Sequence, residues 1–140
     1  MANFLIVGRR QIPSGNVALV EPYMHPDHSI VRPMVRVCGR VILINRDSIV
    51  VGEHPISFSR EHGFCWLQID RVGLNPVVTF RVEDFLPQDG FVPSRAFASR
   101  IVWRDRDGNE QSKLLLSEPD TVLEVLNARQ AIMPSEPEET

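Results

Sequence analysis

The sequence is poor in several residue types that would mark a particular class of protein. Its two cysteines, Cys38 and Cys65, are too few for the disulfide framework of a small secreted protein. Each lies in an apolar run, where a free cysteine behaves as a small buried hydrophobe. No apolar run approaches the roughly 18 residues of a membrane span, and the N-terminus lacks the basic region and long apolar stretch of a signal peptide. We therefore expect no membrane partner and a cytoplasmic protein, or one delivered without such a signal.

The short motifs that carry chemistry are also missing. The sequence has no GxSxG nucleophile motif, no GxGxxG or GxxxxGK phosphate loop and no CxxC or HExxH metal motif. His25, Asp27 and His28 lie close together in a proline-containing segment, but a zinc site needs three or four converging ligands. We interpret these histidines as loop residues, and we expect no metal, no cofactor and no enzymatic activity.

Lysine is nearly absent. Lys113 is the only one, and the other 14 of the 15 basic residues are arginines. Arginine suits bidentate contacts with carboxylates and phosphates, although a GC-rich genome gives the same bias. A net charge of −3 and a pI near 5.8 argue against binding nucleic acid through bulk positive charge.

What the sequence does have is the composition of one globular domain. Its 140 residues are 43% apolar and 24% charged, which is close to the average for soluble proteins and sufficient for a core. We expect residues 1–133 to form a single β-rich domain and residues 134–140 to be a disordered acidic tail.

The strongest structural signal is the segment Val35–Gly52. It predicts two strands joined by a turn at Asn45–Asp47, with one face apolar and the other basic at its beginning. The continuous apolar run from Val41 to Ile44 predicts burial on both faces or a bend at Gly39.

Further short strands follow from alternation and turn residues. We expect a first hairpin of 4–7 and 17–20 around a polar turn, an edge strand at 56–59, strands at 64–69 and 77–82 separated by a loop at 70–76, and a hairpin of 95–103 and 112–116 around Asp107-Gly108. Strands at this spacing indicate a small antiparallel β-barrel or sandwich.

One α-helix is expected at the C-terminal end. Ser117 is its predicted N-cap and Pro119 follows within its first positions, as in a capping-box-like start. Apolar residues then recur at helical spacing until Pro134, which is expected to end the helix.

The run VRVCGRVILINRDSIVV resembles the first two strands of an oligonucleotide-binding (OB) barrel, including its glycine. This likeness covers about a tenth of the chain and implies an OB-like fold that binds single-stranded nucleic acid through basic and aromatic side chains. Such a surface would use Arg36 and Arg40 with Trp66 or Trp103.

The leading hypothesis is a non-enzymatic protein-binding domain that self-associates or binds a protein partner, as an oligomeric structural component, an inhibitor or an immunity-type factor. It depends on the strand pattern and on arginine and tryptophan as interface anchors. The alternatives are a binder of single-stranded nucleic acid and a small-ligand-binding barrel or enzyme. The predicted binding surface consists of Arg32, Arg36, Arg40, Arg46, Trp66 and Trp103.

Overall fold

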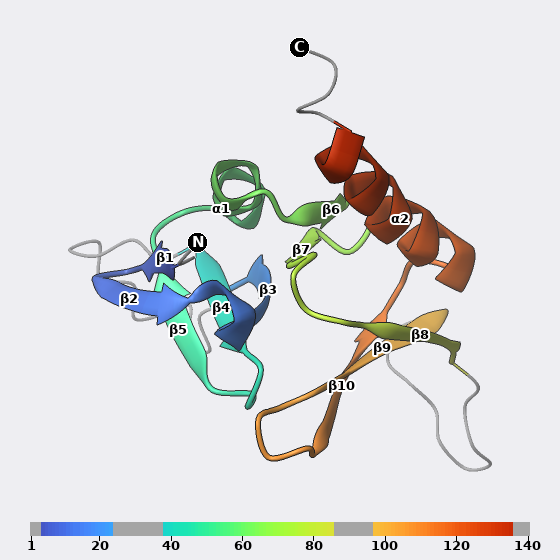
Figure 1. Cartoon of the computed structure of the whole chain (residues 1–140), viewed down its shortest axis with the longest axis horizontal. Coiled ribbons are helices and arrows are strands. Elements are labelled where there is room, and N and C mark those ends of the chain that lie inside the picture. Colours follow the sequence, from blue (N-terminus) through green and yellow to red (C-terminus); the bar gives the residue numbers. More distant parts are fainter. Residues whose placement is uncertain (1–3, 24–37, 86–96, 136–140) are drawn as a thin grey trace, which may run out of the picture.

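The computed structural model describes residues 4–23, 38–85 and 97–135. In these ranges the chain is mostly β, with three antiparallel sheets and two helices, one of which is C-terminal (Figure 1). Each described sheet has two open ends, so the expected barrel and its OB-like form are not confirmed. The fold is instead a stack of layers around one central sheet.

The central layer is a five-stranded sheet with β3 in the middle. The four residues from Val17 to Val20 are all buried, and because successive side chains of a strand point to opposite faces, β3 is covered on both sides. A register shift between Val17 and Leu19 interrupts the alternation within it. The strands in spatial order are β5 (Ser48–Val51), β4 (Gly39–Leu43), β3 (Val17–Pro22), β7 (Val72–Leu74) and β6 (Cys65–Leu67).

The first face of the central sheet is covered by the helix α1 (Pro55–His62) and by a separate hairpin of β1 (Phe4–Val7) and β2 (Arg10–Pro13). A short 3-10 turn, η1 (Ser14–Asn16), leads from this hairpin into β3. Phe58 of α1 is fully buried at the centre of the apolar contacts. We call this set the Phe58 cluster: Val7, Ile12, Val17, Val20, Val41, Val51, Phe58 and Phe64.

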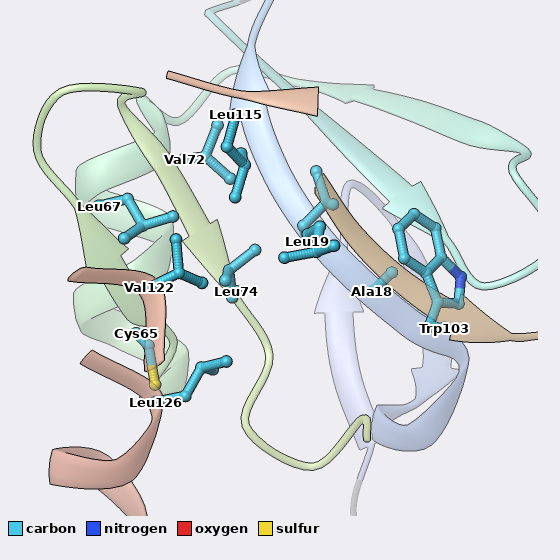
Figure 2. Close-up of a cluster of buried hydrophobic side chains, with 11 residues drawn as sticks. Ala18, Leu19, Cys65, Leu67, Val72, Leu74, Trp103, Leu115, Val122 and Leu126 are labelled. Atoms are coloured by element: carbon cyan, nitrogen blue, oxygen red, sulfur yellow. The ribbon is translucent and has the colours of Figure 1, made fainter. Parts of the chain in front are cut away.

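The second face is covered by a three-stranded sheet and the helix α2 (Pro119–Ser135). The sheet has the order β10 (Glu110–Leu115), β9 (Ser99–Arg104), β8 (Arg81–Asp84). Figure 2 shows Trp103 of β9 beside Ala18 and Leu19 of β3. We call this set the Trp103 cluster: Ala18, Leu19, Cys65, Leu67, Val72, Leu74, Ile101, Trp103, Leu115, Val122 and Leu126.

The predicted hairpin in Val35–Gly52 is confirmed for its described residues. β4 and β5 pair antiparallel from Gly39 to Ile42, and the turn between them holds Arg46 at a positive φ of 79°. Of the run expected to be buried, Val41 is fully buried, whereas Ile42, Leu43 and Ile44 are half-buried. This run packs on both faces, since Val41 and Leu43 contact the Phe58 cluster and Ile42 and Ile44 the Trp103 cluster.

The predicted edge strand at 56–59 is wrong, because this segment belongs to α1. Pro55 occupies the first turn, where a missing N–H is tolerated. Gly63 ends the helix with a left-handed φ of 76°, and the N–H of Phe64 donates to the Ser59 carbonyl at 2.9 Å. The buried side of the helix carries Pro55, Phe58 and Ser59 at helical rather than strand spacing.

Three further predictions about strands need correction. The strand 4–7 pairs with β2 instead of with 17–20, because Gly8 has a φ of 63° and reverses the chain at once. The predicted loop 70–76 contains β7, a strand of only three residues buried between β3 and β6. β8 begins at Arg81, whereas a strand was expected from Val77. The hairpin of β9 and β10 around Asp107-Gly108 is confirmed.

The C-terminal helix is confirmed, but Ser117 is not its N-cap. α2 begins at Pro119, and the N–H of Val122 donates to the carbonyl of Glu118. Ser117 instead bonds Asp70, whose carboxylate accepts the N–H groups of Leu116 and Ser117 and, at 2.6 Å, the Ser117 hydroxyl. Asp70 therefore fixes the start of α2 to the β6–β7 connection.

The helix α2 extends to Ser135, one residue past the proline that was expected to end it, and the rest of the expected tail lies outside the described residues. Neither described helix has the length and apolar character needed to cross a membrane.

Candidate binding cleft

A cleft with a volume of 610 Å³ lies between the central sheet and the three-stranded sheet. On one side its wall is formed by β3, β4 and the start of β5, and on the other by β9 and β10, including Ser112 and Leu114 of the latter. We call it the charged cleft; its lining residues are Leu19, Glu21, Arg40, Ile42, Arg46, Ser48, Phe97, Trp103, Ser112, Lys113 and Leu114.

The strand register explains why charged and apolar residues meet in this cleft. Glu21 lies opposite Arg40, and Arg40 lies opposite Val50, so these three residues form one row across β3, β4 and β5. Directly paired residues share a face of the sheet, and this face is the one that looks toward β10. Val50, at the end of the row, is 39% exposed.

The centre of the cleft is a buried carboxylate held by two cations. Glu21 is 8% exposed, and Lys113 Nζ donates to its Oε1 at 2.8 Å. Arg40 donates to Oε2 through Nε at 2.8 Å and also through Nη2. Burial raises the pKa of Glu21, but the Lys113 ammonium and the Arg40 guanidinium outweigh that effect and hold the pKa below its ordinary value.

Arg46 closes one side of the cleft. It reaches from the turn between β4 and β5 to the backbone carbonyl of Ser112 on β10, to which its Nη1 donates. Arg46 has a positive φ at this turn, a backbone conformation that costs free energy in a residue with a side chain. Three basic side chains and one carboxylate therefore line the described cleft, and such a surplus of positive charge favours an anionic group.

The structure brings together three residues of the predicted binding surface. Arg40, Arg46 and Trp103 all line the charged cleft. Trp66 lies apart on β6, where its Nε1 donates to Gln68 Oε1 at 2.8 Å. The other two residues, Arg32 and Arg36, lie outside the described residues.

Trp103 is not an exposed surface for stacking. It is 2% exposed, its Nε1 donates to the carbonyl of Ile44 at 3.0 Å, and its ring meets that of Phe80 edge to face at 5.9 Å between centroids. The expectation that it presents an aromatic face to a ligand is therefore wrong, and its indole instead forms part of the wall between the sheets.

Two charged residues of the cleft, Glu21 and Lys113, were missed from the sequence. One signal was present, since Lys113 is the only lysine in an arginine-rich chain. No local pattern marks Glu21, because its partners are 19 and 92 residues away.

Trp103 also borders a second, smaller cleft of 410 Å³. Near it, the outer face of the three-stranded sheet carries an ion network in which Arg81 and Arg100 each pair with Glu83, at 2.6 Å. Hydrogen bonds from Arg100 and Arg81 lower the pKa of Glu83. Since Arg81 also pairs with Glu110, these arginines are balanced by acidic neighbours rather than gathered as a basic patch.

Metal ligands do not converge in the part of the chain that the structure describes, where no group of three or more His, Cys, Asp or Glu side chains is placed to hold an ion. The expected loop histidines His25 and His28, with Asp27, fall outside it. No family model, curated protein or solved structure matches the chain. The interpretation of the charged cleft therefore rests on its own residues.

Proposed function

We propose that this protein is a non-enzymatic protein-binding domain that holds an acidic segment of a partner in the charged cleft. The observation that carries the proposal is the convergence of Arg40, Arg46 and Lys113 on one cleft, whose described lining contains one carboxylate. Arginine binds carboxylates through paired hydrogen bonds, which give both strength and orientation.

The apolar part of the lining supports a polypeptide as the ligand. The half-buried Ile42 and Leu114 lie beside the charged residues, so a bound segment would bury apolar surface while its carboxylate meets the cations. Interfaces gain affinity when a charged contact is surrounded by groups that exclude water. An acidic residue flanked by apolar or β-branched residues fits this lining.

Glu21 supports a binding role over a catalytic one. A general base must be able to accept a proton near neutral pH, whereas the two cations that hold Glu21 keep its pKa low. We assign Glu21 the role of orienting Arg40 and Lys113 toward the cleft.

A small anionic ligand is the second candidate, because the cleft volume of 610 Å³ falls within the range of small-molecule sites. The nucleic-acid alternative has less support, since Trp103 is buried and Trp66 lies on a strand of another sheet, so the two tryptophans do not form one stacking surface. Self-association stays a proposal, and it would place an acidic segment of one copy in the cleft of another.

The test is a fluorescence anisotropy titration with a labelled peptide of about eight residues in which Thr and Glu alternate, at low and at moderate salt. We expect saturable binding that weakens with salt, and Lys113→Gln should weaken it about tenfold. The matched control is Arg60→Gln, which removes an exposed cation from α1 on the opposite face of the central sheet; it should leave the affinity within about twofold.

Three further probes separate the alternatives. A thermal-shift screen with citrate and nucleotides detects the small-ligand candidate, and an oligothymidylate of about twelve nucleotides detects the nucleic-acid candidate. Light scattering measures self-association. A monomer that binds no acidic peptide at low salt would rule the proposal out.

A further inference from the structure

One wall of the charged cleft is a strand edge that pairs with no other strand among the described residues. In the described part of the chain β10 is the outermost strand of its sheet. At the turn of the β9–β10 hairpin, the N–H of Asp105 donates to the carbonyl of Asn109. Hydrogen-bonded and non-hydrogen-bonded pairs alternate along an antiparallel ladder. Asp105–Asn109 is a hydrogen-bonded pair, so Ser112–Val102, three pairs further along, is a non-hydrogen-bonded pair. The backbone groups of Ser112 therefore point away from β9.

The bond from Arg46 confirms that direction. Its guanidinium reaches the Ser112 carbonyl from the other wall of the cleft, so this acceptor faces the cleft. The backbone groups of Leu114, two residues further along β10, point away from β9 in the same way, and Leu114 also lines the cleft. A row of backbone groups in this arrangement is a template for another strand.

We propose that the acidic segment binds as an added β-strand along the edge of β10, with alternate side chains facing inward and an acidic one of these at Arg40. The inference rests on the proposed function, and it specifies how the partner is held. Main-chain hydrogen bonds to an edge strand supply affinity in this mode, and alternate side-chain sites supply specificity. The N–H groups of the added strand replace Arg46 as the donor to Ser112.

The position of Lys113 sets the phase of the side chains. Lys113 projects from β10 toward Glu21 and the central sheet, whereas Ser112 and Leu114 project from the opposite face. In an added strand, side chains in phase with Lys113 would face Glu21, Arg40 and Val50. The expected pattern in the partner is therefore a Glu or Asp at an inward position, with outward residues on both sides of it.

The charges favour this occupant over a second copy of β10. The described β10 carries Lys113 at the inward position, so pairing two copies edge to edge would bring a second lysine to a cleft that already holds three cations. Like charges at this range are destabilising. An acidic strand has the complementary charge.

The test compares the alternating Thr-Glu peptide with two N-methylated forms, one methylated at every Thr and the other at every Glu. In an added strand the N–H groups of one set point to β10 and those of the other set point to solvent. We expect one methylated peptide to lose at least about tenfold in affinity and the other to stay within about twofold. A second comparison uses a peptide of the same composition with its Glu residues in one block, which should bind more weakly.

The outcomes separate this inference from the proposed function. If both methylated peptides behave alike, the strand mode is wrong, although binding of the unmodified peptide still supports the cleft as a site for acidic segments. If the unmodified peptide does not bind, the proposed function fails first. If light scattering shows a dimer that Ser112→Pro dissociates, the edge belongs to a second copy and the inference is overturned.

Discussion

The two faces of the central sheet are covered in different ways, although both are built on the same strand. On the first face, Val17 and Val20 of β3 pack into the Phe58 cluster, which α1 and the β1–β2 hairpin cover. On the second face, Ala18 and Leu19 pack into the Trp103 cluster, but the covering layer leaves the charged cleft. The first face is closed and apolar, and the second is open and charged.

This difference matters for the stability of the fold. A buried carboxylate loses its hydration, and ion pairs in such places often add no more stability than well-packed apolar residues of similar size. The row containing Glu21 and Arg40 is therefore a weak contributor to folding compared with the Phe58 cluster. A weak contribution to folding is compatible with the binding role that we propose for this row.

The largest expected effect on stability comes from removing an apolar side chain from the Phe58 cluster on the closed face. Phe58 is fully buried against Phe64, with ring centroids 5.6 Å apart. Phe58→Ala should lower the free energy of unfolding by about 3–5 kcal/mol, because it removes apolar contacts and leaves a cavity. Urea unfolding measures the change. The matched control is Phe4→Ala, since Phe4 is 50% exposed; a loss as large as that of Phe58 would contradict the assignment of the core.

The second expected effect concerns how closely α1 approaches the central sheet. A Cβ atom at Gly73 would lie 1.9 Å from Ser59 Oγ and 3.0 Å from Ser59 Cβ. Gly73→Ala should therefore destabilise the protein by about 1–3 kcal/mol through overpacking. Ser59→Ala should recover part of this loss, because it removes the nearer atom.

A double-mutant cycle by urea unfolding measures that recovery, and the expected coupling is about 1 kcal/mol. Ser59 Oγ is buried without a hydrogen-bond partner among the described contacts, so its removal alone should cost little. Strict additivity of the two substitutions would show that α1 does not pack on Gly73.

A smaller effect, which depends on pH, is expected on the open face. The pKa of Glu21 is lower in the folded protein than its ordinary value, so Glu21 adds stability above the unfolded value of about 4.3 and loses it as pH falls through the lowered one. Glu21→Gln should therefore reduce stability at neutral pH by about 1 kcal/mol, and the difference from wild type should vanish in acid.

Thermal unfolding between neutral and acidic pH checks this prediction, with Glu83→Gln as the control. The pKa of Glu83 is also lowered, but Glu83 lies on the exposed face of the three-stranded sheet, where water and salt screen its partners. A pH dependence of the Glu83 variant as large as that of Glu21 would contradict the contrast between buried and exposed ion pairs.

The parts of the fold that were predicted correctly depend on neighbouring residues. The β4–β5 and β9–β10 hairpins were found because strand alternation and turn residues lie within one short segment. α1 was missed because Ile56-Ser57-Phe58-Ser59 alternates like a strand, and the pair of signals at Pro55 and Gly63 was not connected. β7 was missed because three residues around a glycine carry too little pattern.

Of the charged residues in the cleft, the sequence identified only those that lie within one local hairpin. Arg40 and Arg46 were identified from the β4–β5 hairpin, and both line the cleft. Glu21 and Lys113 depend on the register of β3 with β4 and on the packing of β10 against them, which link residues 92 positions apart. The burial of Trp103 likewise depends on how the three-stranded sheet packs against the central sheet. Tryptophan occurs both in cores and on surfaces, so its presence alone did not predict burial.

The most direct test of the contrast between the two faces is an amide NMR titration of the uniformly labelled protein with the alternating Thr-Glu peptide. We predict that the shift changes concentrate at the charged cleft, in Ile42, Ser48 and the β10 residues from Ser112 to Leu114, while the amides of α1 and of the β1–β2 hairpin stay unchanged. Changes centred on α1 or on the β1–β2 hairpin would contradict the account, because they would place the binding surface on the face that it describes as closed.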